Sequence, residues 1–207
     1  MRYTGPKLRK VRAYGEDFAM AADRSTAAKF VKLHRKQPPG IHGKKKGFSK
    51  LTAYGTQLRE KQKARIFYHL TEKALLKYYH QAAKQTGSTD VGLLVALERR
   101  LDNVVYRAGF TNSHPAARQM ITHGHFLVNG RRLDIPSVQI KPGDVITFSG
   151  KRVGLKDKIT EVSSAEKPVS WLKVDSSNLA IQVTNLPVRE EIQVPFNEKL
   201  IVEFYSR

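Results

Sequence analysis

Apolar side chains recur every four residues from Leu93 to Val105. After Gly124 the pattern changes from one typical of helices to one typical of strands. The four-residue period predicts an amphipathic helix with one buried side, and Gly109 is placed to end it. After Gly124, short apolar runs flank Asn129-Gly130, a dipeptide that favours a two-residue hairpin because both of its positions accept positive φ. The chain therefore combines helices with a small antiparallel sheet, which is an α+β fold.

A short helix and a second turn accompany this hairpin. Asn112 or Ser113 can cap a helix that ends at Gly124, with Pro115 in its first turn. A Pro-Gly-Asp turn at 142–144 precedes an apolar run at 145–148, which predicts a further strand. We expect residues 91–155 to form one helix-plus-hairpin module.

The chain is strongly basic, with 37 Lys and Arg against 18 Asp and Glu and a formal charge of +19. Residues 1–90 hold 21 of these cations and only 6 of the acidic residues. So many unmatched cations repel one another unless an anionic partner neutralises them, which points to nucleic acid. A membrane surface is the weakest candidate, since the basic stretches lack an opposing apolar side and the longest apolar run is too short to cross a bilayer.

Four segments are expected. Residues 1–48 form a basic arm that orders against a partner, with only short helical stretches such as 25–33. Residues 49–90 form a helical domain with helices over about 51–67 and 71–84. The module at 91–155 follows, and residues 156–207 form a linker and C-terminal segment. In that segment we expect variable structure at 156–170 and short strands or packed tails at 171–174, 179–183 and 200–205.

Like charges stand four residues apart on the helix at 51–67, in the pairs Arg59/Lys63 and Lys61/Arg65. Such pairs destabilise an isolated helix by a few tenths of a kcal/mol each. The pattern makes sense if RNA phosphates lie between the cations.

Catalytic and metal chemistry find little support. Cysteine is absent, which excludes disulfides and thiolate sites. His123 and His125 have no third ligand nearby in the sequence, so hydrogen bonding to RNA or turn packing is expected and a metal site is not. Asp102 stands in an Arg-Leu-Asp string inside the apolar helix, where we expect an ion pair with a neighbouring arginine.

These residues resemble the family of small-subunit ribosomal protein S4. The resemblance is strongest in the module, at 97–107, at Ala117-Arg118-Gln119, at His123-Gly124-His125 and at Val128-Asn129-Gly130-Arg131. It continues outside the module, at 2–6, 39–43, 58–63, 197–198 and 202–207. Nearly the whole chain is covered.

The resemblance implies a fold and a function. The fold is a helical domain near the N-terminus, completed by the C-terminal residues, with the α+β module inserted. The function is that of a structural constituent of the small ribosomal subunit, without enzyme activity, cofactor or small-molecule substrate. Such a protein binds a helix junction in the 5′ domain of small-subunit rRNA early in assembly. With ribosomal proteins S3 and S5 it lines the channel by which mRNA enters, and its contact with S5 influences translational accuracy.

Two departures from the family pattern stand out. Many relatives hold zinc with cysteines near the N-terminus, so this chain resembles a zinc-free variant. Many also carry arginine where His114 and Pro115 stand, which moves the expected cationic role at that helix to Arg118.

The expected RNA-binding residues are cations, histidines and one amide distributed over the first three segments. They are Arg2, Lys7, Arg9, Lys10, Arg12, His42, Arg59, Lys61, Lys63, Arg65, Arg100, Arg107, Arg118, His123, His125, Asn129, Arg131 and Arg132. Lys44, Lys45, Lys46 and Lys50 are expected to face mRNA. Six to ten phosphate contacts would make the affinity fall by about three to five orders of magnitude between 50 and 200 mM salt.

Two other functions stay open at this point. An RNA-modifying or tRNA-charging enzyme can carry the same module, but it would append a large catalytic domain, and 52 residues follow residue 155. A free-standing stress or regulatory RNA-binding protein would need no basic arm. A cytoplasmic ribosome is the expected location, with an organellar ribosome as the alternative. Repression of the protein's own mRNA is left open by the sequence.

Overall fold

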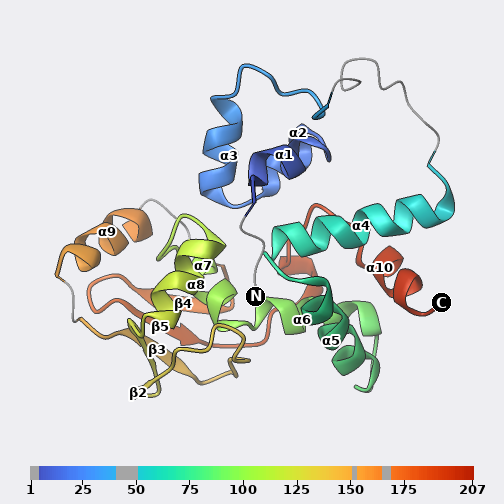
Figure 1. Ribbon diagram of the computed structural model, residues 1–207. Coiled ribbons are helices and arrows are strands. Elements are labelled where there is room, and N and C mark those ends of the chain that lie inside the picture. Colours follow the sequence, from blue (N-terminus) through green and yellow to red (C-terminus); the bar gives the residue numbers. More distant parts are fainter. Residues whose placement is uncertain (1–4, 41–50, 151–152, 165–168) are drawn as a thin grey trace. The chain divides into compact units, whose positions relative to one another are not determined.

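The computed structural model describes residues 5–40, 51–150, 153–164 and 169–207. The chain forms two compact units. The helical unit contains residues 1–94 and 193–207, and the sheet unit contains residues 95–192 (Figure 1). The sheet unit is therefore inserted between two parts of the helical unit in the sequence. No helix in the described ranges has both the length and the apolar character that crossing a bilayer requires.

Three short helices occupy the described residues of the expected arm. They are α1 (Lys7–Arg12), α2 (Glu16–Ala21) and α3 (Arg24–Val31). Val11, Phe18 and Phe30 are buried, one on each helix, and the three helices pack against one another. The predicted helical stretch at 25–33 is confirmed to within two residues by α3, and α1 and α2 add two further short helices to this segment.

Asp23 ties this cluster to the rest of the helical unit. One carboxylate oxygen accepts the backbone N–H of Thr26 at 2.9 Å and so caps α3. The other lies 2.9 Å from Nε2 of His69, in the loop after α4 (Ala53–Phe67). The Asp23 side chain, which is 2% exposed, thus connects α3 to the loop after α4, 46 residues further along the chain.

The helical unit also contains α4, α5 (Glu72–Ala83), α10 (Glu198–Tyr205) and the start of α6 (Thr89–Glu98), which continues into the sheet unit after Leu94. The side chains of Thr52 and Thr71 cap α4 and α5, which confirms both predicted helices to within two residues. Residues 200–205 lie in α10, which Asn197 caps, so a strand there is excluded. The C-terminal helix packs along α4, as the red and cyan ribbons of Figure 1 show.

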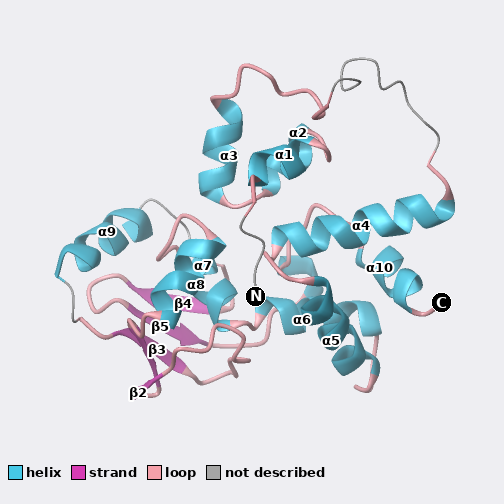
Figure 2. Ribbon diagram, viewed as in Figure 1, coloured by secondary structure: helices cyan, strands magenta, loops and turns pink. Residues whose placement is uncertain are grey.

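An antiparallel sheet forms the base of the sheet unit. Its strand order is β2-β1-β3-β5-β4, with β1 at Phe126–Val128, β2 at Arg131–Arg132, β3 at Val145–Phe148, β4 at Leu172–Asp175 and β5 at Ala180–Val183. The helices of this unit are α7 (Leu101–Arg107), α8 (His114–Thr122) and α9 (Val153–Ser164), with a short 3-10 helix at Arg189–Glu191. Figure 2 shows α7, α8 and α9 on one side of the sheet, where their apolar side chains share one core with the strands.

The sheet unit extends beyond the boundary predicted at residue 155. β5 pairs with β3, with Ile181 opposite Ile146, and β4 then pairs with β5. Residues 153–164 form α9, whose Ile159 is buried in the core, where variable structure was predicted. Sequence-distant strands complete a sheet only when their side chains fill the same core, and local spacing does not reveal this.

The apolar helix predicted from Leu93 to Val105 is interrupted at Arg99 and Arg100. Arg100 has extended geometry, with φ −64° and ψ 136°, and separates α6 from α7. The neighbouring backbone bonds to the segment before β3, with Leu101 N–H donating to Val138 C=O at 3.0 Å and Ile140 N–H to Arg99 C=O at 2.9 Å. The apolar period survives the break, because the side chains on both sides still enter buried space.

Candidate nucleic-acid interface

The start of α8 is the first part of the candidate interface. Ser113 Oγ accepts the Ala116 N–H at 3.4 Å, and Pro115 lies in the first turn, as predicted. The remaining N–H groups at this helix end favour a negatively charged ligand. Arg118 lies one turn further on, partly exposed, with its guanidinium 3.7 Å from the Asp102 carboxylate.

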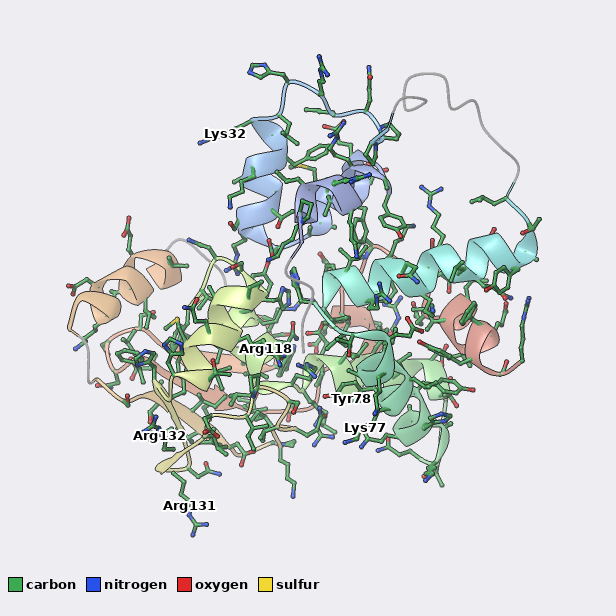
Figure 3. All side chains as sticks on the ribbon, viewed as in Figure 1. Lys32, Lys77, Tyr78, Arg118, Arg131 and Arg132 are labelled. Atoms are coloured by element: carbon green, nitrogen blue, oxygen red, sulfur yellow. The ribbon has the colours of Figure 1, made fainter. Side chains whose placement is uncertain are left out.

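The hairpin between β1 and β2 supplies two further cations. Asn129 and Gly130 have φ of 50° and 77°, which confirms the predicted turn with two left-handed residues. Arg131 and Arg132 are exposed, and Arg131 projects away from the sheet in Figure 3.

Arg132 joins the hairpin to the end of α8. Its guanidinium donates to the His123 carbonyl at 3.5 Å and lies across Gly124, in the space that a β-carbon at that position would occupy. Gly124 also has φ of +71°, so a side chain there would be strained and would displace the arginine. Arg132 therefore bridges the hairpin and the C-terminal end of α8.

Asn129 has a structural task. Its amide Nδ2 donates to Asp144 at 2.8 Å, and its Oδ1 accepts the Val145 N–H at 2.9 Å. Both ends of this amide bind residues of the Pro-Gly-Asp turn and the start of β3, so Asn129 positions the hairpin.

His123 and His125 stand at the joint between α8 and β1. His123 is exposed and His125 half-buried, and their ring centroids are 6.1 Å apart. The His125 ring also lies 6.2 Å from that of Phe148, so this histidine packs against the sheet.

Arg100 and Arg107 are engaged inside the sheet unit. Arg100 is 3% exposed, and its Nε and Nη2 donate to the Asp102 carboxylate at 3.0 and 2.7 Å. This confirms the predicted ion pair of Asp102. Arg107 donates twice to Glu98, at 3.1 and 2.8 Å. Arg100, which was expected to bind RNA, is thus buried in an ion pair, because the break at this residue turns its side chain into the core, whereas Arg107 stays partly exposed.

The cations of α4 have acidic partners within the chain. Glu72 lies between Lys61 and Arg65, with its oxygens 2.6 and 3.1 Å from the two nitrogens. Burial raises the pKa of Glu72, but hydrogen bonds from Lys61 and Tyr205 and the charge of Lys61 outweigh this and leave the pKa below its ordinary value. The anion predicted between this like-charge pair is therefore the protein's own carboxylate.

In the other like-charge pair of α4, Lys63 has a carboxylate partner and Arg59 lies near an aromatic ring. Lys63 pairs with Glu60 at 2.7 Å, and the Arg59 guanidinium lies 5.7 Å from the centre of the Tyr14 ring. Glu60 also accepts the backbone N–H of Asn197 at 2.9 Å, so it ties α4 to the segment before α10. These α4 cations stabilise the helical unit.

The N-terminal cations lie on or next to α1. Arg9 is exposed, and Arg12 donates from Nε to the Gln37 carbonyl at 2.9 Å. Burial and the nearby charge of Arg65 on α4 lower the pKa of Lys10. Lys7 is half-buried. The remaining expected residues lie outside the described ranges: Arg2, His42, Lys44, Lys45, Lys46 and Lys50.

Sequence reasoning missed the outer side of α5. Lys73, Lys77, His80 and Lys84 are all exposed there. The apolar residues of this helix predicted its buried side. The spacing of its cations, three and four residues apart, would have predicted a basic exposed side in the same way.

Comparison with known proteins agrees with this architecture. Residues 2–98 match the model of the ribosomal protein S4/S9 N-terminal domain, and residues 99–146 match that of the S4 domain. The two matches meet at the break between α6 and α7. Neither model is that of an enzyme family.

Curated relatives extend the match to the full chain. The small ribosomal subunit protein uS4 of Gloeobacter violaceus is 43% identical over 206 residues, covering 100% of this chain and 99% of the relative. The uS4 proteins of Acetivibrio thermocellus and Desulfitobacterium hafniense are each 44% identical with the same coverage. This chain belongs to the family of small ribosomal subunit protein uS4, whose members are structural constituents of the small subunit.

Proposed function

We propose that this chain binds a helix junction in the 5′ domain of small-subunit rRNA early in the assembly of the subunit. The observation that carries the proposal is the joined surface of the sheet unit, where Arg132 lies across Gly124 and links the hairpin to the α8 terminus. Arg131 on the hairpin and Arg118 in the middle of α8 add further cations, and the free N–H groups at the start of α8 lie at the other end of that helix. Such a surface suits the shape and backbone of folded RNA.

Two measurements test this proposal. Hydroxyl-radical footprinting of naked small-subunit rRNA with the full chain should protect nucleotides around one helix junction of the 5′ domain. Sedimentation of a native extract should place the protein with small subunits. Protection scattered over the rRNA, or a protein that sediments free of subunits, would favour a regulatory RNA-binding protein instead.

The hairpin turn gives a first prediction. Gly130→Val should weaken rRNA binding more than Arg132→Ala, because a β-branched residue at φ 77° strains the turn and misaims both arginines. Loss of one arginine should cost about 1–3 kcal/mol, as for one charge-assisted hydrogen bond. A β-carbon at Gly130 meets no atom within 4 Å, so the effect arises from backbone geometry and not from a clash.

Filter binding compares the two variants, with circular dichroism to verify that each remains folded. Parent-like binding by a folded Gly130→Val variant would show that the hairpin is not a binding element.

We also propose that the chain lines the mRNA channel of a cytoplasmic ribosome with proteins S3 and S5, and that its contact with S5 influences accuracy. An exposed apolar patch at the start of α4 supports a protein contact. Tyr54 and Leu51 are 51% and 48% exposed, and the Tyr54 ring lies 5.7 Å from that of Phe204 on α10. Exposed aromatic and aliphatic groups of this kind mark protein interfaces.

The lysines at 44–46 and 50 give a second prediction. Changing Lys44, Lys45, Lys46 and Lys50 together to alanine should slow translation through structured messages, because these cations are proposed to face mRNA. Binding to rRNA should stay close to that of the parent. Translation of a paired and an unpaired message by reconstituted ribosomes measures the effect, and equal rates with mutant and parent ribosomes on the paired message would contradict it.

A further inference from the structure

The outer side of α5 carries a row of cations. Lys73, Lys77, His80 and Lys84 are separated by four, three and four residues, which places them on one side of a helix. With a rise of about 1.5 Å per residue, the row extends over about 16 Å. The opposite side of α5 is apolar and faces the core, where its buried residues are Leu75, Tyr78, Tyr79 and Ala82.

The lysines of this row are not neutralised within the described part of the chain. The acidic residue of α5, Glu72, is engaged by Lys61, Arg65 and Tyr205 on its other side. Among the ion pairs between described residues, none includes Lys73, Lys77 or Lys84. This contrasts with α4, whose cations are compensated by Glu60 and Glu72.

The spacing of these charges favours a linear anionic partner. Like charges three and four residues apart destabilise a helix unless a counter-charge lies between them. Consecutive basic residues along the row, with His80 between Lys77 and Lys84, rise by about 4.5 to 6 Å, which is comparable to the distance between neighbouring phosphates of one RNA strand. The exposed side of α5 has Lys77 pointing outward (Figure 3) and no large apolar residue, so it lacks the apolar side by which a helix enters a membrane surface.

We infer that the Lys73, Lys77, His80 and Lys84 side of α5 is a second RNA-binding surface, along which the backbone of one rRNA strand lies. The inference rests on the proposed binding of rRNA and adds a binding surface in the helical unit. The lysines act as point charges toward phosphates, so they contribute affinity and salt dependence and do not read base sequence.

A pair of charge-matched variants tests the inference. Lys73→Gln with Lys77→Gln removes two charges from α5, and Lys156→Gln with Lys173→Gln removes two exposed charges from the sheet unit as the control. The slope of log affinity against log salt should become shallower by about 1.4 to 1.8 in the α5 variant, because each phosphate that is no longer neutralised changes it by about 0.7 to 0.9. Its affinity for small-subunit rRNA should fall about 10- to 100-fold, while the control stays within about threefold of the parent.

A third variant separates charge from structure. Lys73→Arg with Lys77→Arg keeps both charges and should bind like the parent. Hydroxyl-radical footprinting of the glutamine variant should show weaker protection of one strand segment, while the protection at the junction remains. Equal weakening of the α5 variant and its control, or parent-like binding by the α5 variant, would overturn this inference alone. Absence of rRNA binding by the parent would overturn the proposed function and this inference together.

Discussion

The affinity of the chain for small-subunit rRNA should fall about a thousandfold when the salt concentration is raised from 50 to 200 mM. Each neutralised phosphate releases condensed counterions, with a slope of about 0.9 per phosphate on duplex nucleic acid. Six cations that are exposed or partly exposed in the structure are candidates for this role: Arg118, Arg131, Arg132, Lys73, Lys77 and Lys84. Six neutralised phosphates give about three orders of magnitude, the lower end of the expectation from the sequence.

The structure accounts for this lower value. Arg100, Lys61 and Arg65 are cations that the sequence assigned to RNA, and each is held by a carboxylate of the chain. A cation already paired within the protein gains less from a phosphate, because it must first give up its carboxylate.

Filter binding at five or more salt concentrations checks this prediction. A variant with Arg131→Gln and Arg132→Gln should make the slope shallower by about 1.4 to 1.8. A flat salt response of the parent chain would contradict the electrostatic interface.

Replacing Asp102 by alanine should destabilise the sheet unit by about 3–5 kcal/mol. Asp102 is 6% exposed and receives two hydrogen bonds from Arg100, which is itself 3% exposed. The variant removes the carboxylate and leaves a buried guanidinium without this counter-charge, which is the costly way to break a buried pair. The destabilisation is large enough to raise the unfolded fraction by about two to three and a half orders of magnitude, at about 1.4 kcal/mol for each factor of ten.

Native-state hydrogen exchange in the full chain measures this effect at the amides of Val104 and Val105, in the middle of α7. The double variant Arg100→Met with Asp102→Leu is the matched control, because replacing both members of a buried pair by apolar groups is often close to neutral. Protection in Asp102→Ala within about 1 kcal/mol of the parent would show that the pair is not required for stability.

Arg118 should respond differently from Arg100 to the loss of Asp102. Its guanidinium is 29% exposed and lies at 3.7 Å from the carboxylate, so solvent screens this interaction. Of the two arginines beside the Asp102 carboxylate, Arg100 is buried and has a structural role, whereas Arg118 is partly exposed and accessible to RNA.

Local features of this chain were readable from the sequence by itself. The capping residues Thr71 and Ser113, the Asn129-Gly130 turn and the strand after Pro142 depend on contacts within a few residues. Their conformations follow from hydrogen bonds to nearby N–H groups and from the φ values each residue tolerates. The strongly basic charge, and with it the expectation of a nucleic-acid partner, likewise needs no structure.

Tertiary structure alone decided where helices break and which strands join the sheet. The interruption at Arg100 exists because the segment at 136–140 supplies hydrogen-bond partners to the backbone there, and that segment lies more than 30 residues away. β4 and β5 extend the sheet because Leu172, Ile181 and Val183 enter the same core as β1 and β3. Such contacts depend on packing between distant residues, which a local pattern does not encode.

The division of the cations into structural and accessible groups was also decided by the fold. Lys61 and Arg65 looked like a phosphate site because their acidic partner, Glu72, lies beyond the end of α4. Lys73 and Lys77 follow Glu72 on α5 but lie on the exposed side of this helix. Neither lysine forms an ion pair with a carboxylate of the described residues. The sequence determined how many positive charges the chain carries. The packing of α4 against α5 and α10 determined which of them remain available to RNA, because a cation that is already paired with a carboxylate of the chain is less available to a phosphate.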